Sequence, residues 1–208
     1  QQSIELEFLE FLSLFEDHLE AVPYLLGDNP SLGDFAFYGP LYAHLCRDPY
    51  SRRLMEECAP KVVAWVERLR LYNDPPRKFY DRKDSISPTF IALVAHLSKD
   101  SVPTLVHEVT LLQEWLESNL GSSIPRYFGE CNFKVGRGTE HLVGEKRALM
   151  TYPQWMLQRV LDAHNSSSQG DKELTLELFR KIGAKPLLAL DIRWRLARKN
   201  FQLVRENS

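Results

Sequence analysis

Residues 24–35, YLLGDNPSLGDF, predict the end of one helix, a tight turn and the start of a second helix. Gly27 stands where a helix stop is expected, because glycine takes the left-handed conformation after a helix end without a steric penalty. Ser31 supplies an oxygen for the free N–H groups of the next helix, and Asp34 can reach back to the Ser31 N–H. We therefore predict a capping box of Ser31 and Asp34. Replacing Asp34 by alanine is expected to cost about 1 kcal/mol or more.

Apolar residues recur at helical spacing on both sides of this stretch. Residues 4–22 predict an amphipathic helix with an acidic outer face, and residues 32–46 predict a second helix that is apolar nearly all round. A helix without a polar face is normally central, and the Gly39-Pro40 pair predicts a bend within it. Further helices are predicted at 49–57, from 60 onward, and at 88–97, 102–119, 152–164, 172–182 and 186–204.

Two segments interrupt this helical pattern. Residues 73–87 are rich in proline and charge and are expected to be a surface connector. Residues 120–150 hold five of the ten glycines, and the short alternating runs 132–135 and 141–143 predict a small β-hairpin near 130–145. The fold class predicted from these patterns is all-α, with that hairpin as an addition.

Composition excludes several classes of function. The 208 residues carry a net charge of −2, so overall charge provides no attraction to nucleic acid or to an anionic membrane. No apolar run approaches the roughly 20 residues that span a bilayer. The three cysteines are an odd number at unrelated spacings, which favours a reducing compartment, the cytoplasm. The chain begins with Gln1 instead of Met, which suggests a fragment of a longer protein.

Candidate ligand-binding residues are few. Tyr38 and Tyr42 lie one turn apart on the second helix, near His44, and their hydroxyls could face a ligand cleft or could simply be part of the core. Arg126 precedes the glycine-rich segment, where it could hold an anion or anchor a loop to a carboxylate. The basic residues near the C-terminus, among them Arg193, could form a docking helix or a solvated face, for which the acidic first helix offers a complement.

Metal and nucleophile motifs are missing from the sequence. The six histidines show no metal-ligand spacing, and His96 and His107 lie on different predicted helices. Cys46 and Cys58 have no positive group arranged to stabilise a thiolate, so they are interpreted as structural thiols. The serines offer no nucleophile elbow. We therefore predict no catalytic residue and no metal ligand.

Residues 24–35, called the hinge from here on, resemble the turn into the buried sixth helix of glutathione transferases. In that family an apolar helix ends in a glycine turn and is followed by a proline, a serine or threonine cap, and an aspartate. The resemblance covers roughly residues 4–72, continues through Asp48-Pro49, and reaches the helix after Ala59-Pro60; residues 152–160 are similar to a longer-tailed branch of the family. The hinge residues that carry it are Tyr24, Leu25, Gly27, Pro30, Ser31, Asp34 and Phe35.

The resemblance implies a domain organisation and a partner. Residues 1–74 would be the helical core similar to the C-terminal domain of the family, and 75–208 a helical extension packed on it as one continuous domain. In the family, a thioredoxin-like domain holds and activates glutathione, and no stretch of this sequence matches that domain. The resemblance therefore implies a helical domain that contributes the electrophile side of a pocket, a thioredoxin-like partner in cis, glutathione as the co-substrate of the parent protein, and room for a homodimer.

Two other classes of function stay open at the level of sequence. The chain could be a non-catalytic interaction or scaffold module, because a helical domain without its catalytic partner presents a ready binding surface. It could also carry small apolar ligands in a cleft near Tyr38 and Tyr42. Whether the chain is part of an enzyme depends on the thioredoxin-like domain, and alone it is expected to conjugate nothing.

Overall fold

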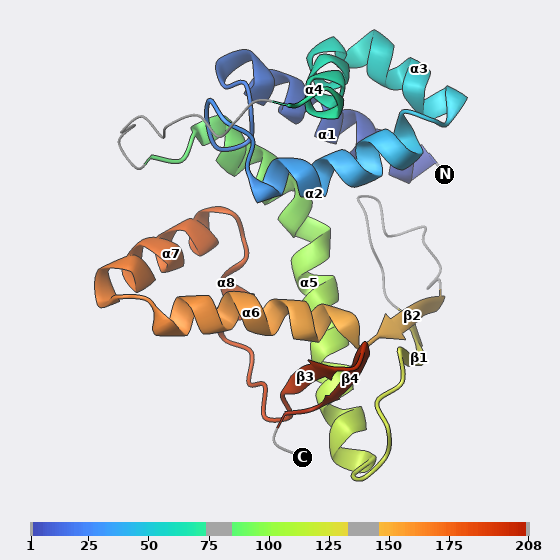
Figure 1. Ribbon diagram of the computed structural model, residues 1–208, viewed down its shortest axis with the longest axis vertical. Helices are drawn as coiled ribbons and strands as arrows, with labels where there is room; N and C mark the ends of the chain where they lie inside the picture. Colours follow the sequence, from blue (N-terminus) through green and yellow to red (C-terminus); the bar gives the residue numbers. More distant parts are fainter. Residues whose placement is uncertain (1, 74–84, 133–145, 207–208) are drawn as a thin grey trace. The chain divides into compact units, whose positions relative to one another are not determined.

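The computed structural model describes residues 2–73, 85–132 and 146–206 (Figure 1). The chain divides into two compact units, residues 1–97 and 98–208. The sequence had placed a boundary at residue 74, inside the connector. Most of that connector, and most of the two runs predicted to form the hairpin, lie outside the described residues.

Unit 1 is entirely helical in its described part. Its elements are α1 (Gln2–Ala21), α2 (Leu32–Pro40), the π-helix η1 (Leu41–Leu45), α3 (Pro49–Cys58), α4 (Pro60–Arg70) and the first turns of α5 (Pro88–Ser118). The amphipathic pattern of α1 explains why one face of this helix packs into the core. That apolar face supplies the fully buried Leu12 and Phe15. Phe15 meets Trp65 of α4 edge to face at 5.0 Å, so one aromatic contact joins the two helices at the centre of the core.

The second helix continues past its proline, as expected, but in a different form. Pro40 has no N–H to donate to the preceding turn, and the chain widens into the π-helix η1, where the Cys46 N–H donates to the Leu41 carbonyl at 2.7 Å. The expectation of a central helix is wrong for unit 1 as described, because Leu32 is 89% exposed and Phe35 46% exposed. Only Asp34 of α2 and Leu41 of η1 are buried, and the half-buried Phe37 packs against Phe11 and Phe15 of α1.

A single helix, α5, replaces the two helices predicted at 88–97 and 102–119. It runs unbroken through Pro103, although an interior proline removes one backbone hydrogen bond. Buried side chains on both sides of the proline, Leu93, Val102 and Val109, hold the helix in place. Burial of the apolar face of α5 therefore outweighs the tendency of Pro103 to end the helix.

Unit 2 combines the rest of α5 with short helices and two antiparallel strand pairs. The strand pair β1 (Tyr127–Asn132) and β2 (Lys146–Met150) flanks the segment predicted to form a hairpin, in the register Cys131 to Arg147. The helices α6 (Tyr152–Ser166) and α7 (Gln169–Lys181) follow close to prediction, and α7 ends before Gly183, whose φ is +74°.

The long C-terminal helix predicted at 186–204 is wrong. Residues 185–206 form the four-residue helix α8 (Lys185–Leu188) and the hairpin of β3 (Leu196–Lys199) and β4 (Gln202–Arg205). Arg193 pairs with Glu117, and Arg195 pairs with Asp162 and Glu206, all within unit 2.

Three buried glutamines explain why this segment is extended. Gln113 of α5 and Gln158 of α6 each bind both backbone groups of one residue, Trp194 and Leu196 respectively, with distances of 2.8–3.1 Å. Gln154 lies between them, donating to the Trp194 carbonyl at 2.9 Å and accepting from Gln113 at 2.7 Å. The glutamine side chains thus take the place of a neighbouring strand for this part of the backbone.

Candidate functional site

The hinge between α1 and α2 is built around a reciprocal pair of hydrogen bonds. Tyr24 and Gly27 form an isolated antiparallel bridge, which turns the chain after α1. The Asp34 N–H donates to Ser31 Oγ at 3.4 Å, and the Ser31 N–H donates to Asp34 Oδ2 at 2.8 Å. Ser31 and Asp34 therefore make a capping box that fixes where α2 begins.

Asp34 does more than cap the helix. Its side chain is fully buried, and its second oxygen, Oδ1, accepts from the Leu25 N–H at 2.9 Å and from Trp65 Nε1–H at 3.1 Å. One carboxylate thus joins the turn before α2, the start of α2 and the centre of α4. A buried carboxylate is tolerated only where donors surround it, and Asp34 has four.

His18 supports the same hinge from α1. It is fully buried, and its Nε2 lies 3.3 Å from the Tyr24 carbonyl, which can only accept, so Nε2 carries the proton. Nδ1 then accepts from the Thr89 hydroxyl at 2.9 Å. Burial lowers the pKa of His18, against the opposing influence of the backbone at Tyr24 and Leu25 and the charge of Asp34.

The lowered pKa of His18 predicts a loss of stability in mild acid. Below the ordinary value of about 6.5, the unfolded chain takes up a proton that the folded chain does not, so stability falls as pH drops from about 6.5 toward the folded pKa, by at most about 1.4 kcal/mol per pH unit. Urea unfolding between pH 7.5 and 5, followed by tryptophan fluorescence, to which Trp65 of unit 1 contributes, measures this slope. His18→Gln should flatten it, and the exposed His44→Gln should leave it unchanged; equal slopes in all three proteins would contradict the assignment.

A cavity of about 250 Å³ opens beside Tyr42 of η1. Its apolar wall comes from Met55 of α3 and from Val63 and Val66 of α4. The Tyr42 ring is stacked on Tyr38 with centroids 5.1 Å apart and planes 7° apart, so Tyr38 holds the ring that lines the cavity. The structure thus brings together two of the residues singled out in the sequence.

The rim of this cavity is charged. Arg52 pairs with Glu56 and Arg70 with Glu67, each at 2.7 Å, whereas the Arg47 guanidinium lies 5.4 Å from the centre of the Tyr42 ring. An apolar floor with cationic groups at its edge suits a small ligand with an apolar body and a polar or electron-rich end.

Two side chains in or next to this cavity, Cys46 and Tyr38, have raised pKa values. Burial raises the pKa of Tyr38, and the neighbouring Tyr42 raises it further. Burial also raises the pKa of the Cys46 thiol, whose sulfur lies 3.9 Å from the Met55 sulfur. The raised pKa values favour the protonated forms of both side chains near neutral pH.

Two residues predicted for the site lie elsewhere. His44 is on η1 but is exposed and does not line the cavity. Arg126 is an exposed residue of unit 2, and its backbone carbonyl accepts from the Thr151 N–H at 3.3 Å. A second cavity, of about 640 Å³, lies along the hinge and is lined by Tyr24, Arg68 and Tyr72 among others; no sequence pattern had pointed to it.

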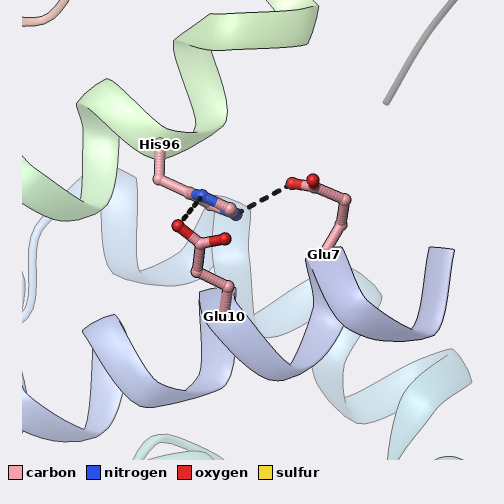
Figure 2. Close-up of side chains that lie close together, drawn as sticks. All are labelled: Glu7, Glu10 and His96. Carbon is pink, nitrogen blue, oxygen red and sulfur yellow. Dashed lines mark ion pairs between the residues drawn. The ribbon is translucent and has the colours of Figure 1, made fainter. Parts of the chain in front are cut away.

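Sequence analysis also did not identify a group of potential metal ligands. Among the described residues, one set of three potential ligands lies close enough together to share an ion: Glu7, Glu10 and His96 (Figure 2). The spacing of Glu7 and Glu10 places both on one face of a helix, which the sequence could have revealed. His96 is far away in the chain and reaches them only because α5 packs on α1.

These features define a class: an α-helical domain whose hinge is fixed by a capping box and a buried aspartate bound to a core tryptophan. A family model described as the glutathione S-transferase C-terminal domain matches residues 2–68, about a third of the chain, so this segment is similar to that domain. The match agrees with the resemblance found in the sequence. No curated protein and no solved structure matches the chain significantly. Among the described residues, no helix combines the length and the apolar character needed to cross a membrane.

Proposed function

We propose that unit 1 is the electrophile-binding half of a glutathione-transferase-like protein, and that a thioredoxin-like domain in cis supplies glutathione. The observation that carries this proposal is the cavity beside Tyr42, which lies within the helical core to which residues 2–68 are matched. Its lining is suited to binding and not to activating a thiol, because Tyr38 and Cys46 both have raised pKa values. This chain alone would then conjugate nothing.

The cavity favours a particular class of ligand. Met55, Val63 and the Tyr42 ring accept a flat apolar body, and the Arg47 guanidinium can meet a nitro or carbonyl oxygen at its edge. An electron-poor aromatic or an unsaturated carbonyl compound fits this description. Negative charge that develops on such an electrophile during thiol attack would face the Arg47 guanidinium, since the other two arginines of the rim are paired with glutamates.

Binding of a probe electrophile tests the role of the cavity. Tyr42→Ala should weaken the binding of 1-chloro-2,4-dinitrobenzene by about tenfold, since one well-packed aromatic contact is worth roughly 1 to 1.5 kcal/mol. Isothermal titration calorimetry without glutathione measures it. Tyr50→Ala is the matched control, because Tyr50 also lies under an arginine, Arg53 at 5.5 Å, but is outside the cavity. Equal loss in both variants, or no binding by the parent chain, would remove the support for this site.

A second experiment tests whether the protein carries the proposed thioredoxin-like domain. The intact mass of the protein from its natural source is expected to exceed that of this 208-residue chain by a thioredoxin-like segment, and that longer protein is expected to conjugate glutathione. Conjugation by the 208-residue chain itself would contradict the proposal. The three cysteines are free thiols, which fits a reducing compartment, and we place the protein in the cytoplasm on that ground.

An interaction module is the second candidate function. The exposed apolar side chains Leu26, Leu32 and Leu71 of unit 1 are 62%, 89% and 66% accessible, and such residues often contact a partner protein, a second copy of the chain included. Leu32→Ser distinguishes the candidates. It would abolish binding to a partner or self-association while leaving electrophile binding intact, whereas Tyr42→Ala would do the opposite.

A further inference from the structure

Three side chains of unit 1 converge outside the cavity and the hinge. Glu7 and Glu10 point from one face of α1 toward His96 of α5, and their carboxylates lie on the two sides of the imidazole ring (Figure 2). Glu7 Oε2 is 3.6 Å from His96 Nε2, and Glu10 Oε1 is 3.5 Å from His96 Nδ1. One potential ligand atom from each residue lies within 4.8 Å of the other two.

His96 is buried in a way that requires a partner. Its ring is 7% exposed, and its Nδ1 atom is buried without a hydrogen-bond partner among the described residues. A buried nitrogen without a hydrogen-bond partner destabilises the folded chain, so such atoms are rare in native proteins and call for an explanation such as a bound ion. Here the nitrogen faces a carboxylate that belongs to another helix.

The distances distinguish two kinds of interaction. A charged imidazole bound directly to a carboxylate has N to O distances of about 2.7–2.9 Å, shorter than both contacts of His96. Ligand atoms that share a tetrahedral ion at about 2.1 Å lie roughly 3.4 Å from one another. The 3.5 Å separation of Glu10 Oε1 from His96 Nδ1 matches shared coordination better than direct hydrogen bonding, and the 3.6 Å separation of Glu7 Oε2 from Nε2 is also longer than a charged hydrogen bond.

We propose that Glu7, Glu10 and His96 bind a divalent transition-metal ion, and that this ion is Zn²⁺. One imidazole and two carboxylates suit zinc better than magnesium or calcium, which prefer oxygen ligands alone. His96 Nδ1 and Glu10 supply the first two ligands. Glu7, whose side chain is 24% exposed, supplies the third by a change of rotamer, and water completes the tetrahedron.

The ion has a definite effect on unit 1. Two glutamates one turn apart on a helix repel each other, and a cation between them removes that repulsion. Because the ligands come from α1 and α5, the ion also links the first and last helical segments of unit 1. This inference does not depend on the proposed function of the cavity.

Zinc titration of the metal-stripped chain tests the site. We expect saturable binding of one Zn²⁺ per chain by isothermal titration calorimetry, an increase in Tm on binding, and a visible absorption spectrum of tetrahedral type with Co²⁺. Glu7→Gln, Glu10→Gln and His96→Gln should each lower the affinity at least tenfold and abolish the Co²⁺ spectrum. Glu5→Gln removes a charge from the same helix outside the cluster, and it should bind zinc as the parent chain does.

Several results would overturn the site. They are the absence of saturable binding, an equal effect of Glu5→Gln and Glu10→Gln, and full affinity in His96→Gln. An NMR titration in which the His96 ring responds to pH but not to Zn²⁺ would show an ion pair of the imidazole with the carboxylates instead. If His96→Gln does not fold, the two glutamate variants decide, because their side chains are partly exposed.

Discussion

Asp34→Ala is expected to destabilise unit 1 by about 3–7 kcal/mol, several times the cost expected from the sequence alone. Loss of the helix cap accounts for about 1 kcal/mol. The Leu25 N–H and Trp65 Nε1–H, both inside the core, would also lose their acceptor, at about 1–3 kcal/mol each. Since domains are typically stable by only 5–15 kcal/mol, this variant should be close to unfolding at room temperature.

A second aspartate cap provides the matched control for Asp34. Asp48 caps α3 and accepts from the Tyr50 and Ser51 N–H groups, both at 3.0 Å, but it is exposed. Asp48→Ala should therefore cost only about 1 kcal/mol. Urea unfolding followed by tryptophan fluorescence, to which Trp65 of unit 1 contributes, compares the two variants. Equal losses would mean that Asp34 acts as an ordinary cap and that its bond to Trp65 adds nothing.

The hinge was predictable because its chemistry is local. Ser31 and Asp34 lie three residues apart and follow the short-range rule for beginning a helix. The prediction that Gly27 ends the preceding helix is wrong, because α1 ends at Ala21 and Gly27 belongs to the later bridge with Tyr24. The bond from Trp65 to Asp34 spans 31 residues and follows no such rule. Local patterns thus gave the position of the hinge but not the buried contact that stabilises it most.

The candidate sites show the same division. Tyr38 and Tyr42 lie one turn apart in the sequence, and their stacking beside a cavity follows from that spacing. The cavity wall from α3 and α4, and the approach of His96 to Glu7, depend on how helices pack, which sequence spacing does not specify. The C-terminal hairpin was missed for a related reason, since residues 186–204 have helical spacing and the interactions that hold them extended come from distant glutamines.

The second large effect is expected at one of those glutamines. Gln158→Met should destabilise unit 2 by about 2–4 kcal/mol. Methionine keeps the length and apolar contacts of the side chain, but it leaves the N–H and carbonyl of Leu196 without partners in a site where Leu196 is 1% exposed. Each orphaned backbone group costs about 1–3 kcal/mol.

The location of the damage is as informative as its size. Because Gln158 holds the start of β3, amide hydrogen exchange should accelerate first across β3 and β4, while α1 to α4 of unit 1 keep their protection. Gln169→Met is the control, since Gln169 is exposed and its amide meets only Glu173, at 3.1 Å; it should change stability by less than about 0.5 kcal/mol. If the two variants were equally stable, or if exchange rose evenly along the chain, the hairpin would be held by its own strand pairing. A larger loss of stability in Gln158→Met, with faster exchange confined at first to β3 and β4, would show that the buried amide of Gln158 holds this helix-like sequence in strands.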